Sequence, residues 1–391
     1  MMIWKPGKRL IFLAFLLASC FTNRKMNVDF APEYSARKKS EILEVALLKS
    51  NDFETTVYLK ISEKTFTQKE KLAEMEILFV DEQDLKSSLS QNQYSWEQLM
   101  AGLDFKLDLE IEQQGNLVFV IRDSEANILV EKSVNIAQER SGIILRDVDD
   151  KLIFSKFYER PEPLKVSYDP SVCEQVYVYK TNESFFQIPS LPYYIKKDSI
   201  KEVPSLEKIS FNQNKIQFKE NGSYCFVCEK AYLKMHKWLY YQSSRDDAVA
   251  NNSFLEALKY ICTEEEYKKL LSSSDKQKAI ETYWLKKGGA YGRAAILQNE
   301  YAQRVNNAIN LFSSSKLGHL TDQGMIYIVM GQPQRVEKYQ MKEIWKYPNF
   351  ENVFFVFEKN DFGEMILIRN EAYEAIWNKA VGFWYNGVLV R

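Results

Sequence analysis

The spacing of apolar residues changes near residue 231, and this change limits the folds that the chain can adopt. Before it, short apolar segments alternate with polar residues, most strictly over Phe105–Glu112. Alternation with a period of two is typical of antiparallel strands that bury one face. After it, apolar residues recur at helical spacing, as at Leu255, Leu258 and Ile261. We therefore expect an α+β multidomain chain in which antiparallel sheets precede the helices.

Changes in composition divide this chain into domains. Residues 41–160 predict an antiparallel β-sandwich domain, because short strands with polar turns recur along them. The Arg160–Pro163 run contains two prolines and predicts a boundary, after which residues 161–230 predict a second β-rich domain. Residues 231–391 predict a helical segment followed by a C-terminal α+β module.

Four local patterns predict individual elements. The Asn221–Gly222 pair, which lies between two strand-like segments, predicts a tight hairpin. Thr263–Glu266 forms a capping box that starts a helix. The apolar run Met325–Met330 predicts a strand. Residues 352–357 and 365–368 predict a further hairpin.

The first twenty residues have the layout of an export signal. Three basic residues precede the apolar run Leu10–Leu17, which is too short to cross a bilayer, since a spanning helix needs about 20 residues. Small residues and a cysteine follow in Leu17–Cys20, and this segment resembles the lipobox of bacterial lipoprotein signal peptides. The resemblance implies a signal peptide over 1–19 and a mature chain that begins with an acylated Cys20. Residues 20–40 predict a polar tether between the lipid and the first domain.

Acylation of Cys20 predicts where the protein lies. Several acyl chains hold a protein to a membrane almost permanently, since each buried CH₂ contributes about 0.8 kcal/mol. No acidic residue occurs in the five positions after Cys20, so we expect the periplasmic face of the outer membrane, with surface exposure left open. Loss of the signal peptide takes away three positive charges and no negative one, which lowers the formal net charge from −1 to −4. That charge predicts no nucleic-acid partner.

The five cysteines include one Cys-x-x-Cys pair. Cys225 and Cys228 lie in a strand-like segment, where residues three apart point to opposite faces of a sheet. This placement argues against a redox or zinc site and favours two buried small side chains. An oxidising compartment allows one disulfide, between Cys173 and either Cys225 or Cys228, and the pairing of these residues and of Cys262 stays open.

A short segment in the C-terminal half resembles the Gly-Trp-x-Thr-Asp signature of the GWxTD domain. It consists of Gly318, His319, Leu320, Thr321 and Asp322. Residues 300–312 resemble the helix that precedes this signature, and residues 324–333 resemble the strand and turn that follow it. Residues 343–357 resemble the closing strands, so that the resemblance covers about 255–370.

Two positions depart from the family pattern. His319 replaces the signature tryptophan, and Gln332 replaces a proline. A ligand or reaction that needs the tryptophan is therefore not expected here. The resemblance implies an exported protein of diderm bacteria, often a lipoprotein, with β-sandwich domains ahead of the module. It implies no substrate.

Two interpretations of the signature stay open. In the first, Gly318 takes a left-handed conformation after a helix, while Thr321 and Asp322 hold the next turn. In this interpretation Arg304 pairs with Asp322 or with Glu300. In the second, charged residues build a ligand site from Arg304, Asp322, Arg335 and Glu343.

The sequence contains no recognisable catalytic set. His236 and His319 lie far apart without metal-ligand spacing, and the glycine-rich residues 286–292 predict a flexible turn. We expect no cofactor and no metal. The predicted function is that of a lipid-anchored, non-catalytic interaction or scaffold protein that binds other envelope proteins. A glycan- or cell-wall-binding module, and an enzyme with a polar site near Asp322, are the alternatives.

Overall fold

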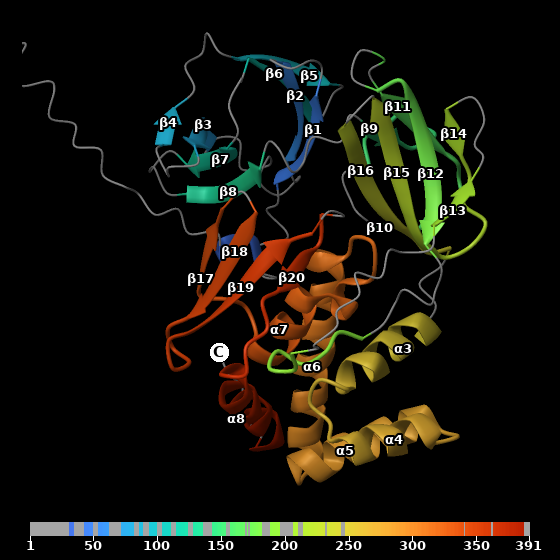
Figure 1. Ribbon diagram of the computed structural model, residues 1–391, viewed down its shortest axis with the longest axis vertical. Helices are drawn as coiled ribbons and strands as arrows, with labels where there is room; N and C mark the ends of the chain where they lie inside the picture. The colour runs from blue at the N-terminus through green and yellow to red at the C-terminus, as the bar shows by residue number, and fades with distance from the viewer. Residues whose placement is uncertain are drawn as a thin grey trace, which may run out of the picture.

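The chain is an α+β protein with two β-sandwich units, a helical segment and a C-terminal α+β module (Figure 1). The strands of both sandwiches are antiparallel except for β10 (Phe157–Tyr158), which pairs with β16 (Leu233–Tyr241) in parallel. The computed structural model describes residues 31–34, eight strands between 43 and 135, and most of 143–386. The gaps in the last range are 154–156, 169, 171–172, 182–187, 196–205, 210–213, 231–232, 244–246, 340 and 361–362. The predicted signal peptide and Cys20 lie outside the described residues.

The first sandwich unit has two four-stranded antiparallel sheets, with strand orders β1-β2-β6-β5 and β4-β3-β7-β8. Its strands are β1 (Leu43–Lys49), β2 (Glu54–Ile61), β3 (Leu72–Asp81), β4 (Lys86–Ser88), β5 (Tyr94–Leu99), β6 (Asp104–Glu110), β7 (Gly115–Asp123) and β8 (Ile128–Asn135). Val57 of one sheet and Leu117 to Phe119 of the other are fully buried. The strand that the alternating pattern predicts near Phe105 is confirmed as β6.

The second sandwich unit packs a five-stranded sheet, β10-β16-β15-β12-β13, against a three-stranded sheet, β14-β11-β9. Its strands are β9 (Ile143–Arg146), β10 (Phe157–Tyr158), β11 (Leu164–Tyr168), β12 (Gln175–Thr181), β13 (Leu206–Ile209), β14 (Lys215–Ile216), β15 (Gly222–Lys230) and β16 (Leu233–Tyr241). Leu145 and Val166 from the small sheet meet Val178, Phe226 and Leu239 from the large one in a buried core. The boundaries predicted at 160–161 and 230–231 both fall inside this unit, because β16 pairs with β10 and with β15.

The hairpin predicted at Asn221–Gly222 is wrong. Gly222 has a positive φ of 144°, but it begins β15, which pairs with β12 and β16 and not with β14. The preceding strand β14 pairs with β11, so that Ile216 lies opposite Leu164 in the other sheet. The Asn-Gly pair therefore lies where the chain passes from one sheet to the other. The positive φ is a local preference of glycine, whereas the choice of strand partner depends on distant parts of the chain.

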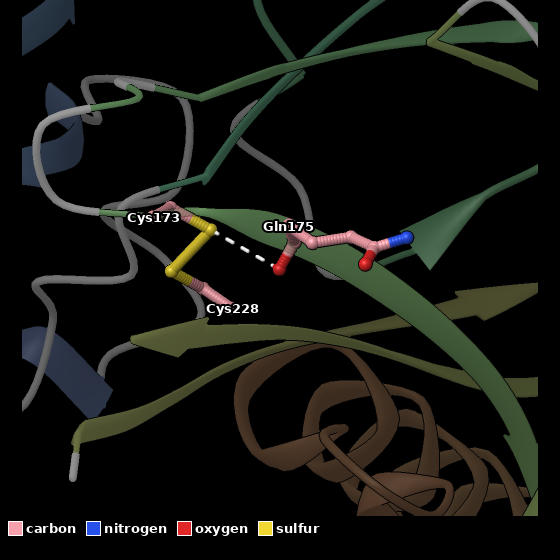
Figure 2. The surroundings of a disulfide bond; sticks show 3 residues. All are labelled: Cys173, Gln175 and Cys228. Carbon is pink, nitrogen blue, oxygen red and sulfur yellow. Dashed lines mark hydrogen bonds between the residues drawn. A yellow bond between two sulfur atoms is a disulfide. The ribbon is translucent and has the colours of Figure 1, made fainter. Parts of the chain in front are cut away.

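A disulfide joins the loop before β12 to the core face of β15. Cys173 bonds to Cys228 with a Cα–Cα distance of 5.5 Å, in the usual range, and the Cys173 Sγ lies 3.4 Å from the carbonyl oxygen of Gln175 (Figure 2). This result selects one of the two predicted pairings. Cys225 is a free thiol on the opposite face of the same strand, where it packs with Trp238, as the spacing of the pair predicts.

Six labelled helices follow the sandwiches (Figure 1). They are α3 (Asp247–Leu258), α4 (Glu264–Ser272), α5 (Lys276–Gly288), α6 (Tyr291–Phe312), α7 (Asp322–Met330) and α8 (Tyr373–Asn386). The predicted capping box is confirmed, because the Thr263 hydroxyl accepts from the Glu266 amide and the Glu266 carboxylate accepts from the Thr263 amide. Helix α5 ends at Gly289, whose φ of 71° is the left-handed conformation favoured for glycine.

The strand predicted at Met325–Met330 is wrong, because these residues form most of helix α7. Thr321 caps the start of this helix, and Gly331 ends it with a φ of 86°. All six side chains from Met325 to Met330 are buried. A short helix that is buried on every side has no polar face. Its sequence therefore shows no helical spacing of polar residues, and it looks the same as a buried strand.

The C-terminal sheet has the strand order β17-β18-β19-β20 and is antiparallel throughout. Its strands are β17 (Arg335–Lys338), β18 (Lys342–Tyr347), β19 (Val353–Lys359) and β20 (Met365–Leu367). The predicted hairpin is confirmed as β19 and β20, with Phe357 opposite Leu367. One face of the sheet carries Trp345 and Phe355 into a core shared with α6, α7 and α8. No helix among the described residues is both long enough and apolar enough to cross a membrane.

The 3₁₀ helix η1 (Ala31–Tyr34) packs into this same C-terminal core, where the Tyr327 hydroxyl bonds to Tyr34 from 293 residues away in sequence. Ala31 and Tyr34 are both buried. The tether predicted over 20–40 is therefore interrupted by a docked segment. Apolar contacts with the distant core determine this position, and no local pattern in residues 31–34 indicates it.

Candidate functional site around the signature turn

The signature residues form the turn that joins α6 to α7. The turn contains a 3₁₀ helix, η6 (Gly318–Leu320), and Thr321 then caps α7. The Gly318 amide donates to the hydroxyl of Ser313, the C-cap residue of α6, at 2.9 Å. The end of one helix is thus bonded to the start of the turn that begins the next.

Two glycines let the turn lie against neighbouring backbone. A Cβ on Gly318 would lie 1.9 Å from the carbonyl oxygen of Ala308 in α6. A Cβ on Gly324 would lie 1.8 Å from the carbonyl oxygen of Gly318. Gly318 does not have a positive φ, so the predicted left-handed conformation is wrong, and its requirement for glycine is the close approach of α6.

Thr321 links the two halves of the turn. Its hydroxyl donates to the Gly318 carbonyl oxygen at 2.7 Å and accepts from the Gly324 amide at 2.9 Å. The second bond satisfies one of the free amides at the N-terminus of α7. The prediction that Thr321 holds the turn is confirmed by these two bonds.

Asp322 bonds to residues that are distant in sequence. Its Oδ1 lies 2.6 Å from Nη2 of Arg369 and its Oδ2 lies 3.2 Å from Nη1, so the pair is bidentate. The same Oδ2 accepts from the Leu367 amide at 2.8 Å. Arg369 Nη2 also donates to the Ser190 carbonyl oxygen at 2.9 Å. Asp322 therefore ties α7 to β20, and through Arg369 to the segment that follows β12.

His319 is completely buried, in the position where the family has tryptophan. Its Nε2 lies 2.8 Å from Oε2 of Glu256 in α3, and its carbonyl oxygen accepts from the Tyr260 hydroxyl at 2.6 Å. Burial raises the pKa of Tyr260 well above its ordinary value, and the carboxylates of Asp322 and Glu256 raise it further. An indole ring has one donor and no acceptor, whereas His319 adds Nδ1, which has no hydrogen-bond partner here.

The turn also contacts the second sandwich. Leu317 and Leu320 pack against Tyr240 of β16, and Tyr240 stacks on Phe157 with ring centroids 5.5 Å apart. The signature therefore connects three parts of the described structure, namely the helical segment, the C-terminal sheet and the second sandwich.

The charged residues of the proposed ligand site have different partners. Arg304 bonds to Glu300 through Nε at 3.1 Å, which confirms one of the two predicted pairings. Its Nη1 lies 3.4 and 3.3 Å from the last carbonyls of α7, where a cation complements the helix dipole. Arg335 lies 3.4 Å from Glu337, and Glu343 accepts from Trp345 and from Tyr34. Asp322, as described, pairs with Arg369.

Sequence reasoning missed three residues around the turn, namely Arg369, Glu256 and Tyr34. Arg369 follows a strand that the pattern did predict, but nothing in its spacing indicates Asp322 as its partner, 47 residues away. Glu256 lies on the helix predicted around Leu255, and 63 residues separate it from His319. A buried aspartate needs hydrogen-bond donors. This need is the one signal that could have suggested a basic partner for Asp322.

The free thiols do not have the properties of nucleophiles. Burial raises the pKa of both the Cys225 and the Cys262 thiol to about 12, so each stays protonated at neutral pH. No group of three or more His, Cys, Asp or Glu side chains within the described residues has a metal-binding arrangement.

Comparison with protein families identifies the C-terminal part. Residues 222–386 match the model of the GWxTD domain. The chain carries a GWxTD domain. Its match begins at β15, so it takes in the last two strands of the second sandwich, as well as α3 to α8 and the C-terminal sheet.

Other known proteins add little to the GWxTD match. No curated protein matches the chain. One solved structure, titled "Anomalous substructure of Titin-A168169", is 10% identical, with 52% of this chain and 96% of that chain covered and a TM-score of 0.19. At that TM-score the likeness says nothing about the fold or function of this chain.

Proposed function

We propose that this protein is a lipid-anchored component of the cell envelope that acts by binding other envelope proteins and not by catalysis. The observation that carries the proposal is the Leu17–Cys20 segment, with its preceding basic and apolar residues. Its expected location is the periplasmic face of the outer membrane.

The bonds around the signature turn support a non-catalytic role. The carboxylate of Asp322 accepts from Arg369 and from a backbone amide, and the hydroxyl of Thr321 bonds to backbone on both sides. The Asp322 carboxylate and the Thr321 hydroxyl therefore use these hydrogen bonds to hold the fold together. The polar residues of the GWxTD signature therefore support packing of the domain better than they support an enzyme site.

The outer face of the C-terminal sheet supports a binding role. Phe355 and Phe357 point into the core, so Phe354 lies on the opposite face, where it is 53% exposed. Tyr339 and Met341, next to the turn between β17 and β18, are also exposed. Exposed aromatic and methionine side chains are enriched in protein interfaces.

The alternative of glycan binding has less support. It was motivated by the many Trp and Tyr residues, whose faces stack on sugars when they are exposed. The tryptophan side chains that the structure describes are all buried, and they are Trp238, Trp284, Trp345, Trp377 and Trp384. Four of these rings, Trp284, Trp345, Trp377 and Trp384, fill the core of the GWxTD domain, and Trp238 packs beside Cys225 on the outer face of the five-stranded sheet.

Replacement of Cys20 tests the anchor. We expect Cys20→Ser to abolish labelling of the chain by a fatty-acid analogue and to block cleavage of the signal peptide. Replacement of residues 1–20 by an ordinary cleavable signal is expected to release a folded periplasmic protein, since the mature net charge of −4 gives no attraction to anionic lipids. Tight membrane association of that protein without any partner would refute the proposed anchor.

Crosslinking in living cells, followed by purification in mild detergent, tests the binding role. We expect a small reproducible set of envelope proteins to be captured by the wild-type chain, and capture to fall for Phe354→Asp. Ser274→Asp, on the loop between α4 and α5, is the matched control that adds the same charge away from the sheet. Recovery of the protein without partners would refute a scaffold role.

A further inference from the structure

We propose that the GWxTD domain contains a binding pocket for a tyrosine side chain and that the chain's own Ala31–Tyr34 segment is its ligand. We call this segment the N-terminal clip. It lies within the predicted tether, yet Ala31 is 5% exposed and Tyr34 is 8% exposed. A tether would leave both in water, so their burial needs a site that recognises them.

The hydroxyl of Tyr34 enters a buried polar site. It donates to Oε1 of Glu343 at 2.5 Å, and Glu343 is only 4% exposed. The same oxygen accepts from Trp345 Nε1 at 2.5 Å and from Gln323 Nε2 at 3.3 Å. Of these three donors, Tyr34 alone comes from outside the domain. The buried carboxylate therefore gains a bond when the clip is in place, and it loses one when the clip leaves.

The ring of Tyr34 lies among aromatic side chains of the domain. Its centroid is 5.6 Å from that of Phe312, in a stacked arrangement, and 5.0 Å from that of Trp345. The Nζ of Lys338 lies 5.4 Å from the ring centroid, which is within the range of a cation–π contact. The pocket thus matches a ring with a hydroxyl at its end, which is the shape and polarity of tyrosine.

Two side chains of the domain bind the clip's backbone. The Tyr327 hydroxyl donates to the Tyr34 carbonyl oxygen at 3.2 Å, and Gln332 Nε2 donates to the Ala31 carbonyl oxygen at 3.2 Å. The domain therefore contacts both ends of the clip and the side chain at its C-terminal end. This combination of backbone and side-chain contacts is typical of peptide recognition.

The clip determines which domain lies near the anchor. Eleven residue steps separate Cys20 from Ala31, and at about 3.5 Å each they reach at most about 40 Å. The GWxTD domain is then held near the membrane, although it is the last domain in the sequence. This consequence rests on the proposed lipid anchor, whereas the pocket and its ligand do not.

A labelled peptide tests the pocket in the full mature chain. The probe is a fluorescent peptide with the sequence of Asp29–Arg37, followed by anisotropy. We expect saturable binding to the Tyr34→Ala chain and none to the wild type, whose pocket is filled. A peptide with Phe in place of Tyr is expected to bind about tenfold more weakly, because it lacks the hydroxyl. The Tyr194→Ala chain, which alters a tyrosine that is 59% exposed, is the control and is expected to behave as wild type.

The outcomes separate the clip from the anchor. Absence of binding to a folded Tyr34→Ala chain, or equal binding to it and the wild type, overturns the clip. If Tyr34→Ala does not fold, Tyr34→Phe keeps the ring but lacks the hydroxyl, and the labelled peptide must then bind to the Tyr34→Phe chain under conditions in which it does not bind to the wild type. In vesicles, energy transfer from a donor at Tyr291→Cys to labelled headgroups is expected to fall in the Tyr34→Ala chain. Absence of transfer in every chain refutes the anchor, and the peptide result still decides the clip.

Discussion

Replacement of Gly318 by alanine tests the packing role of the signature turn. The added Cβ would lie 1.9 Å from the Ala308 carbonyl oxygen, whereas ordinary contact begins at 3.4 Å. The turn and α6 must therefore separate by about 1.5 Å, the difference between these distances. An extra methylene in a packed core lowers the unfolding free energy by about 1–3 kcal/mol when neighbouring side chains can move to make room for it. Since the neighbour here is helix backbone, we expect Gly318→Ala to lower the unfolding free energy by at least about 3 kcal/mol.

Calorimetry of the mature chain measures this loss. For a domain of this size each kcal/mol moves Tm by about 2–4 °C, so the transition of the GWxTD domain is expected to fall by about 6–12 °C. Fluorescence of the buried Trp284 and Trp345 identifies which transition belongs to this domain, because a multidomain chain does not unfold in a single step.

Gly382→Ala is the matched control for Gly318→Ala. Gly382 lies inside α8, and a Cβ there would meet nothing within 4 Å. Alanine is favoured over glycine within a helix by about 0.5–1 kcal/mol, so the control is expected to raise Tm slightly. An unchanged Tm for Gly318→Ala would refute the claim that close approach to α6 requires glycine at this position.

Two further predictions concern a charged pair and alkaline pH. Asp322→Ala leaves the Leu367 amide without its acceptor and the Arg369 guanidinium without its carboxylate, so we expect a loss of about 3 kcal/mol in chemical denaturation. Lys268→Ala, which breaks an exposed pair within α4, is expected to leave stability unchanged, and equal losses would contradict the reasoning. Burial raises the pKa of Tyr158 and of Tyr224 to about 12. The unfolded chain ionises near pH 10, so the stability from each tyrosine is complete below about pH 10 and is lost progressively between pH 10 and 12. Unfolding measured against pH, with tyrosinate absorbance, tests this, and a flat profile to pH 12 would contradict it.

Local patterns predicted those elements whose causes are local. The capping box at Thr263 is confirmed because both of its bonds join residues three apart. Cys225 and Cys228 point to opposite faces of β15 because alternation along a strand is a property of the backbone itself. The order of sheets before helices followed from the change in apolar period, which reflects how each element buries one side.

Local patterns gave wrong predictions where a distant contact determined the structure. The apolar run at Met325–Met330 is buried on every side by the rest of the domain, so the sequence shows no polar face whose spacing would reveal the helix. Gly222 has the positive φ that the Asn-Gly pair predicts, but strand pairing placed it at the start of β15 instead of in a hairpin turn. At Gly222 the backbone preference was correctly identified and the strand partner was not, whereas at Met325–Met330 the type of element itself was predicted wrongly.

The sequence located the candidate site but did not show which contacts its residues make. The signature and its two glycines can be located by eye, because glycine, threonine and aspartate have turn preferences of their own. That Gly318 is required by the backbone of α6, and that Asp322 pairs with Arg369, follows only from the packed structure.

The sequence by itself determined the order of sheets before helices, the capping box at Thr263, the faces of Cys225 and Cys228, and the signature that the GWxTD domain match supports. The tertiary structure alone decided the disulfide partner of Cys173 and the docking of Tyr34 on Glu343, 309 residues away. The physical reason is the range of the forces involved. Backbone preferences and capping bonds act within a few residues, whereas burial and ion pairing join any residues that the fold brings together.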